Sequence, residues 1–176
     1  MNTARALHTS TAINTGEFLV AGGIANTSSG ESLASAELFN PPRGKWKPTG
    51  SKSEASVFAT ATPLPKGEVL GAGGGANGSS NCLATAELFN PATGQWTTTG
   101  RMTTPHCNHS ATLLANGQVL VAGGGNSTGL NPLNIAELFN PATGTWQATA
   151  SLAAINRFPE AIALSCQAKP LLRAAQ

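Results

Sequence analysis

The run His106-Cys107-Asn108-His109 is the densest group of side chains that could bind a metal. Zinc prefers imidazole and thiolate ligands and needs three or four of them. Successive side chains of an extended strand point to opposite faces, so Cys107 and His109 should share one face and His106 the other. Two ligands on one face do not make a site, and His8 lies in another part of the chain. We therefore expect strand histidines that are hydrogen-bonded between neighbouring units, with no metal and no cofactor.

Three glutamates, Glu37, Glu87 and Glu137, stand 50 residues apart and could be taken for a ring of acids. A residue that recurs once in each repeat is more typical of architecture than of catalysis, and a buried carboxylate needs an ion pair or N–H donors. We expect pairing across neighbouring units, with backbone amides or with the basic side chains Arg5, His8 and Arg157.

No catalytic set is complete in the sequence. The chain has no Asp and no Tyr, and it lacks the G-x-S-x-G motif of serine hydrolases. The run GAGGGANG from Gly71 to Gly78 resembles a phosphate-binding loop, but no Lys-Ser/Thr ends it and no helical pattern follows. We therefore expect that the protein is not an enzyme.

The three cysteines, Cys82, Cys107 and Cys166, show no pattern of their own. Their number is odd, they share no short ligand spacing, and they do not recur with the repeat. We interpret them as incidental thiols rather than as a disulfide framework or a zinc site.

The composition excludes two classes of partner. Ten Lys and Arg against eight Glu give a net charge of +2, which is too little for a nucleic-acid surface. The apolar runs are far shorter than the ~20 residues that cross a bilayer. The N-terminus shows no signal-peptide pattern, so the sequence leaves the compartment open.

Two blocks recur three times along the chain. One is AELFNPPRGKW at 36–46, AELFNPATGQW at 86–96 and AELFNPATGTW at 136–146, and the other is GEFLVAGG at 16–23, GEVLGAGG at 67–74 and GQVLVAGG at 117–124. A fixed period of this length is typical of tandem structural units. The repeated structural residues are Gly22, Gly23, Gly73, Gly74, Gly123, Gly124, Glu37, Glu87, Glu137, Trp46, Trp96 and Trp146.

Each unit predicts four antiparallel strands, here named a to d in chain order. In the third unit, two β-prone runs flank Asn116-Gly117, a strong hairpin signal. The glycine doublet then permits a left-handed turn or a close backbone approach. Residues 136–140 predict strand c, and the turn Asn-Pro-Ala-Thr-Gly leads into strand d at Trp146. We expect all three repeated tryptophans to pack between units. Four strands in each repeat indicate a β-propeller blade.

The order of these elements resembles the kelch repeat, and most closely the bacterial kelch-like propellers and the propeller portion of galactose-oxidase-like proteins. Kelch repeats usually carry Tyr-Asp before the proline, where this chain has Phe-Asn. The resemblance implies an all-β, incomplete propeller. We divide it into blades at 1–50, 51–100 and 101–151, the first strand of a fourth blade at 152–164 and an irregular tail at 165–176.

The C-terminal tail departs from the repeat. We hypothesise a frameshift near Leu164, with an ordinary divergent terminus as the alternative. Closed propellers have four to eight blades, so three blades and one strand leave exposed edges and end faces, through which we expect a homo-oligomer.

The loops between strands b and c differ most between units, and repeat scaffolds usually place binding there. We predict a non-catalytic scaffold that binds a protein or a glycan through these loops. The alternative is an inactive fragment of a galactose-oxidase-like or sugar-processing propeller enzyme. The candidate loop residues are Asn26, Ser28, Asn77, Ser79, Asn81, Asn126, Thr128 and Asn131.

Overall fold

The computed structural model describes residues 1–25, 30–76, 81–125 and 132–152. In these residues the chain forms fourteen β-strands and one short 3-10 helix. Twelve strands build three four-stranded antiparallel sheets, and the other two form a small ribbon. The predicted all-β fold of four-stranded blades is therefore confirmed. Most of the segment predicted as a fourth-blade strand, and the whole tail at 165–176, lie outside the described residues.

Each blade is one antiparallel sheet. Blade 1 contains β1 (Thr9–Ala12), β2 (Phe18–Ala21), β3 (Ala36–Asn40) and β4 (Lys45–Thr49), with the 3-10 helix η1 (Pro41–Arg43) between the last two. Blade 2 contains β5 (Thr60–Pro63), β6 (Val69–Ala72), β9 (Ala86–Asn90) and β10 (Gln95–Thr98). Blade 3 contains β11 (Ser110–Leu113), β12 (Val119–Ala122), β13 (Ala136–Asn140) and β14 (Thr145–Ala148). The ribbon of β7 (Gly75–Ala76) and β8 (Asn81–Cys82) extends from the b–c connection of blade 2.

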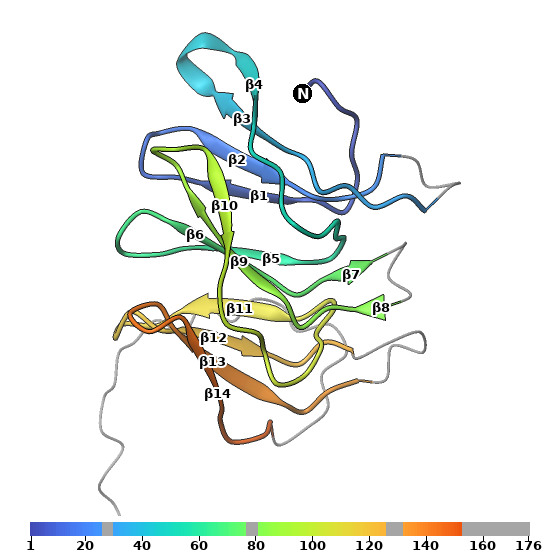
Figure 1. The fold of residues 1–176 in the computed structure, drawn as a ribbon, viewed down its shortest axis with the longest axis vertical. Coiled ribbons are helices and arrows are strands. Elements are labelled where there is room, and N and C mark those ends of the chain that lie inside the picture. The colour runs from blue at the N-terminus through green and yellow to red at the C-terminus, as the bar shows by residue number, and fades with distance from the viewer. Residues whose placement is uncertain (26–29, 77–80, 126–131, 153–176) are drawn as a thin grey trace, which may run out of the picture.

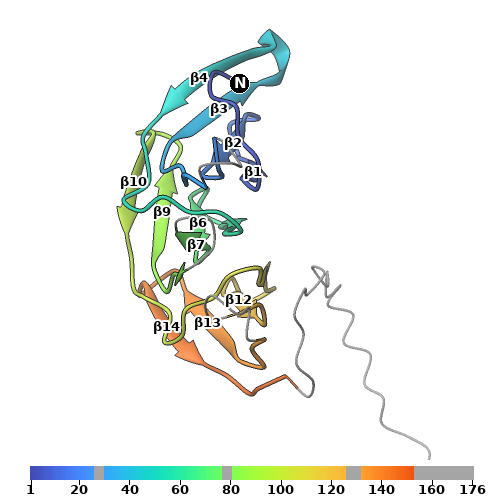
Figure 2. The same ribbon diagram turned by 90° about the vertical axis from the view of Figure 1, so that its right-hand side faces the viewer.

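The three blades follow one another along an arc. Figure 1 shows β1, β5 and β11 on neighbouring levels, and β5 packs against both of the others. Figure 2 shows the fourth strands β4, β10 and β14 along the opposite, outer side. The first strand of every blade therefore faces the inside of the arc, and the fourth strand lies outside.

Two apolar clusters join the blades. One combines Leu19 and Leu38 of blade 1 with Val69 and Phe89 of blade 2, and Trp96 packs against it. The second combines Leu70 of blade 2 with Val119 and Phe139 of blade 3, and Trp146 packs against it. Since side chains alternate along the strands, each cluster combines one face from each of two neighbouring sheets. The core therefore lies between the blades.

The repeated tryptophans take up related positions. Each ring lies tilted beside a phenylalanine of its own blade, with ring centroids 4.8 Å apart for Phe39 and Trp46 and 5.0 Å apart for Phe139 and Trp146. Trp146 also donates its indole N–H to the Gly100 carbonyl, at 2.9 Å, on the segment that leaves blade 2. Trp96 and Trp146 thus pack between blades as predicted. The same prediction was wrong for Trp46, which lies on the face of blade 1 that no described blade covers.

The glycine doublets bring the end of the second strand against the next blade. Gly23 has a φ of 93° and Gly74 one of 98°, a region that side chains rarely adopt. The N–H of Gly23 donates to the Ser56 carbonyl at 2.8 Å, and that of Gly74 donates to the His106 carbonyl at 2.8 Å. A Cβ on Gly23 or Gly74 would collide with a backbone carbonyl of its own blade, and a Cβ on the first glycine of either of these doublets would collide with a carbonyl of the next blade, so the close approach requires both glycines.

Candidate binding surface

The inner strands form a hollow lined by hydroxyl groups. Its volume is about 300 Å³. The lining residues are His8, Thr9, Ser10, Thr11, Ala59, Thr60, Ala61, Thr62, His109, Ser110 and Ala111. Hydroxyls both donate and accept hydrogen bonds, and the lining contains no carboxylate and no lysine or arginine. The surface therefore suits a neutral polar ligand better than an ion.

A left-handed residue precedes the inner strand of each blade. Leu7, Phe58 and Asn108 have φ angles of 57°, 53° and 51°, which is uncommon for residues other than glycine. The N–H of Phe58 donates to the Leu7 carbonyl, and that of Asn108 to the Phe58 carbonyl, each at 3.3 Å. These turns therefore stack from blade to blade beside the start of the inner strands.

The left-handed turn overturns the predicted arrangement of the histidines. His106 and His109 do not point apart, because the chain between them is not extended at Asn108. Their rings instead lie edge to face with centroids 5.7 Å apart. The rule of alternating faces fails wherever one residue leaves the β region.

His109 connects two blades. Its Nε2 is hydrogen-bonded to the Thr60 hydroxyl of blade 2 at 2.9 Å, as expected for a histidine between units. Burial, together with the neighbouring His106, lowers the pKa of His109 to about 3. The ring is therefore neutral at physiological pH and serves as a hydrogen-bonding group of the wall. His8, in the same register of blade 1, is exposed.

The three repeated glutamates hold the segments that lead into the blades. Glu37 accepts the N–H groups of Asn2 and Thr3 at 2.7 and 3.0 Å, and Glu137 accepts those of Thr103 and Thr104 at 2.8 and 3.0 Å. Glu87 accepts the Ser53 N–H at 2.8 Å. The prediction of backbone amide partners is correct, but the partners belong to the same repeat unit rather than to a neighbouring one. The reason is that each incoming segment crosses the third strand of its own sheet.

A different basic side chain accompanies each glutamate. Arg5 lies 3.2 Å from the Glu37 carboxylate, and His106 Nε2 lies 3.4 Å from that of Glu137. Burial would raise the pKa of Glu37, but the N–H donors and Arg5 outweigh it and hold the pKa below its ordinary value. In blade 2, Lys52 donates to the Ser56 hydroxyl; burial lowers the pKa of this amine, against the opposing effect of Glu87 and Glu54. The buried carboxylates are therefore structural groups rather than open acids.

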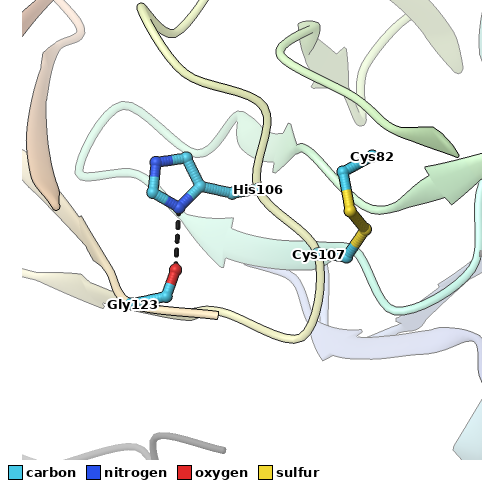
Figure 3. The surroundings of a disulfide bond; sticks show 4 residues. All are labelled: Cys82, His106, Cys107 and Gly123. Atoms are coloured by element: carbon cyan, nitrogen blue, oxygen red, sulfur yellow. Dashed lines mark hydrogen bonds between the residues drawn. A yellow bond between two sulfur atoms is a disulfide. The ribbon is translucent and has the colours of Figure 1, made fainter. Parts of the chain in front are cut away.

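Cys82 and Cys107 form a disulfide, which corrects the prediction of incidental thiols. Their Cα atoms lie 5.3 Å apart, within the usual range for a bridge. Cys82 ends β8 of blade 2, and Cys107 precedes β11 of blade 3, so the bond joins two blades (Figure 3). Figure 3 also shows the adjacent His106, whose Nδ1 donates to the Gly123 carbonyl at 2.8 Å. This pair could not be predicted from the sequence because 25 residues separate the cysteines and neither recurs in the other units.

The b–c connections begin and end at equivalent positions in the three blades. Their stems pair at Ile24 with Ser32, in the ribbon β7–β8, and at Gly125 with Pro132. Each stem also pairs with the segment before the inner strand, through Ala6, Val57 or Cys107. The predicted loop residue Asn81 is exposed at the start of β8. The other seven predicted residues lie outside the described part of the chain: Asn26, Ser28, Asn77, Ser79, Asn126, Thr128 and Asn131.

Neither a metal cluster nor a membrane helix is found in the part of the chain that the structure describes. No three His, Cys, Asp or Glu side chains come together there in a way that would hold a metal ion. No helix in those residues is long and apolar enough to cross a membrane.

Comparison with known proteins supports the kelch resemblance. Residues 106–153 match the family model of the kelch motif. A solved structure titled "Structure of YjhT" matches with a TM-score of 0.72 and 16% sequence identity, and the match covers 85% of this chain and 53% of that one. No curated protein matches the chain. Residues 106–153 therefore carry a kelch motif, and the successive four-stranded sheets have the fold of a partial β-propeller, about half of the matched structure.

Proposed function

We propose that the protein is a non-catalytic binding scaffold. Its ligand surface comprises the hydroxyl-lined inner wall and the b–c loops whose stems adjoin it. The observation that supports this most is the pairing of three equivalent loop stems with the segments that lead into the three inner strands. Repeat scaffolds gather binding residues in this way, because each repeat delivers its variable loop to the same side.

The chemistry of the wall favours a carbohydrate or a polar peptide segment. Thr9, Thr60 and Ser110 present hydroxyl oxygens that donate to strand-b carbonyls of their own blades and can still accept, and neutral His109 adds a polar ring without a net charge. Such groups match sugar hydroxyls and peptide amides, which also donate and accept. The described wall supplies no strong charge with which to bind a phosphate or a basic peptide.

The non-catalytic character rests on where the acids and nucleophiles lie. The three repeated glutamates are buried and accept backbone N–H groups, and two cysteines form a disulfide. His109 is too weak a base to be protonated near neutral pH. No described carboxylate therefore accompanies the hydroxyls of the hollow.

Binding of the purified chain to a glycan array and to a panel of immobilised polar peptides tests this proposal. We expect binding to one panel, and a weakening of about thirtyfold when His8 and Thr9 are changed together to Ala and Val, since two lost polar contacts cost about 1 kcal/mol each. The matched control is Thr97→Val on the outer strand β10, which should leave binding unchanged. Equal loss in both variants, or silence on both panels, would contradict the proposed surface.

A further inference from the structure

Every blade has two chemically different faces. The aromatic face carries a residue of strand b, a Phe of strand c and a Trp of strand d; the leucine face carries one Leu of strand b and one of strand c. The aromatic-face residues are Phe18, Phe39 and Trp46, then Val69, Phe89 and Trp96, then Val119, Phe139 and Trp146. The leucine-face residues are Leu19 and Leu38, then Leu70 and Leu88, then Leu120 and Leu138.

Both junctions inside the chain join a leucine face to an aromatic face. Blade 1 supplies its leucine face to the aromatic face of blade 2, and blade 2 supplies its own to blade 3. Burial there is nearly complete: Phe89 and Phe139 are 0% exposed, and Leu70 is 1% exposed. One type of contact is thus used twice.

The two ends of the arc present the two unmatched faces. Phe18 on blade 1 is 41% exposed, whereas Val69 and Val119 at the same register are 0% exposed. Leu120 on blade 3 is only half-buried, whereas Leu19 at the same register is 0% exposed. Blade 1 therefore ends in an aromatic face, and blade 3 ends in a leucine face.

A polar contact at the outer rim repeats the same order. The Gly50 N–H and the Thr49 hydroxyl donate to the Gly94 carbonyl at 2.8 and 3.1 Å. Gly100 and Thr99 donate to the Gly144 carbonyl at 3.0 and 3.3 Å in the same way. The corresponding donors after blade 3 are Ala150 and Thr149, and the corresponding acceptor on blade 1 is the carbonyl of Gly44, another left-handed glycine with a φ of 60°. Donors stand at one end of the arc and the acceptor at the other.

We propose that two copies of this chain close into one six-bladed ring, with the leucine face of each blade 3 packed on the aromatic face of the other copy's blade 1. The occupant of each end is a second copy because the two end faces reproduce the two sides of the junctions already present. A two-fold axis satisfies both ends at once, so the assembly stops at two chains. Six blades fall within the four to eight of closed propellers, and the match covers 53% of the solved chain, so two arcs supply a comparable length.

The junction between copies differs from the internal ones at one residue. A Cβ at Gly50 or Gly100 would run into the carbonyl of Gly94 or Gly144, and Ala150 carries such a Cβ. The outer rim must therefore move slightly apart between copies. Ala150→Gly should consequently tighten the dimer and lower its dissociation constant several-fold.

Sedimentation equilibrium of the full chain over a wide dilution series is the first test. We expect a species of twice the 17.7 kDa chain mass that dissociates on dilution. Phe18→Glu and Leu120→Glu should each leave a folded monomer, as judged by an unchanged β-sheet circular dichroism spectrum. Leu113→Glu is the control, because Leu113 is 39% exposed but lies on neither end face, and it should stay dimeric.

A cross-link tests the head-to-tail geometry itself. A Cβ at position 50 would lie 3.3 Å from Gln95 Cα, so the equivalent pair between copies is Ala150 and Lys45. With Cys166 changed to Ser, a mixture of Ala150→Cys chains and Lys45→Cys chains should form a disulfide-linked heterodimer, and neither variant alone should. A monomer at every concentration, an open ladder of oligomers, or a dimer without this link would overturn the proposal. So would a full chain that dimerises only after residues 153–176 are removed, because its own C-terminal segment would then cover the leucine face.

Discussion

Blades 1 and 3 each bury a glutamate at the equivalent position of the third strand, but its basic partner differs. In both, a buried glutamate on the third strand accepts two backbone N–H groups from the incoming segment. In blade 1, Arg5 adds a permanent charge and also donates to the Gly22 and Ser35 carbonyls at 2.8 and 2.9 Å. In blade 3, His106 replaces it and donates to a single carbonyl. The pair of N–H donors is therefore the shared device, and the basic side chain varies.

The two N–H donors explain why the basic side chain can differ between the blades. A carboxylate with two N–H donors is already largely compensated, so its remaining requirement can be met by an arginine, a lysine nearby or an imidazole. Arginine reaches more acceptors than imidazole does. Blade 3 instead gains the disulfide between Cys82 and Cys107, which blade 1 lacks because Ala6 stands in the register of Cys107. The two blades are thus anchored by different chemistry.

Removing the carboxylate should give the largest difference in unfolding free energy between variants of blade 1 and blade 3. Glu37→Leu leaves the buried guanidinium of Arg5 unpaired and should lower the free energy of unfolding by about 3 to 5 kcal/mol. Glu137→Leu should cost less, about 1 to 3 kcal/mol, because it leaves two backbone N–H groups without their acceptor but no buried guanidinium. Urea denaturation measures both values. Equal costs would show that the basic partner has no part in the difference.

Removing the disulfide should weaken the junction of blades 2 and 3. Closing a loop of 25 residues stabilises a protein by about 3 kcal/mol in the chain-entropy model. Cys82→Ser with Cys107→Val should therefore lower the midpoint of urea unfolding, and reduction of the wild-type chain should do the same. Cys166→Ser is the control. An unchanged midpoint in the double variant would mean that the bond adds nothing to this junction.

Acid should weaken blade 3 before it weakens blade 1. The pKa of His109 is about 3 in the fold, against about 6.5 when unfolded, so the unfolded chain binds more protons between these values. Stability should therefore fall as pH drops below about 6.5, by up to about 1.4 kcal/mol per pH unit. His109→Gln should flatten this slope in urea titrations at several pH values, and His8→Ala should not. An unaltered slope in His109→Gln would exclude this histidine as the cause.

Removing the threonine hydrogen bonds at the outer rim should give the smallest loss of stability. Thr49 Oγ1 donates at 3.1 Å and Thr99 Oγ1 at 3.3 Å to the next turn glycine. Thr49→Val and Thr99→Val should each cost about 1 kcal/mol, with the shorter contact costing slightly more. Thermal unfolding resolves this if both variants retain the wild-type spectrum. A stabilised variant at either place would contradict the assigned contact.

The repeat allowed the blades to be predicted because spacing and alternation are local properties. Asn116-Gly117 marks a hairpin, and the turn residue Gly117 does adopt a φ of 82°. The phase shared by Trp96 and Trp146 indicated packing between blades, which the two apolar clusters show. A pattern repeated three times leaves little freedom in assigning strands.

The pairing of single residues could not be predicted in the same way. Cys82 and Cys107 come together through the ribbon β7–β8 and the stacking of two blades, neither of which the spacing of cysteines encodes. Asn108 has a positive φ and donates its N–H to the Phe58 carbonyl of the preceding blade, and neither feature is visible in the spacing of His106 and His109, whose predicted alternation was therefore wrong. Contacts of this kind depend on how neighbouring blades pack, which the spacing of residues in the sequence does not reveal.

Amide hydrogen exchange tests most directly whether the glutamate with its N–H donors is the device common to all three blades. Asn2, Ser53 and Thr103 have exposed side chains and lie outside the strands, yet each donates its backbone N–H to a buried glutamate. We predict slow exchange at these three amides, and loss of protection at Thr103 alone in Glu137→Leu. Exchange at all three as fast as at an exposed loop amide would contradict this account.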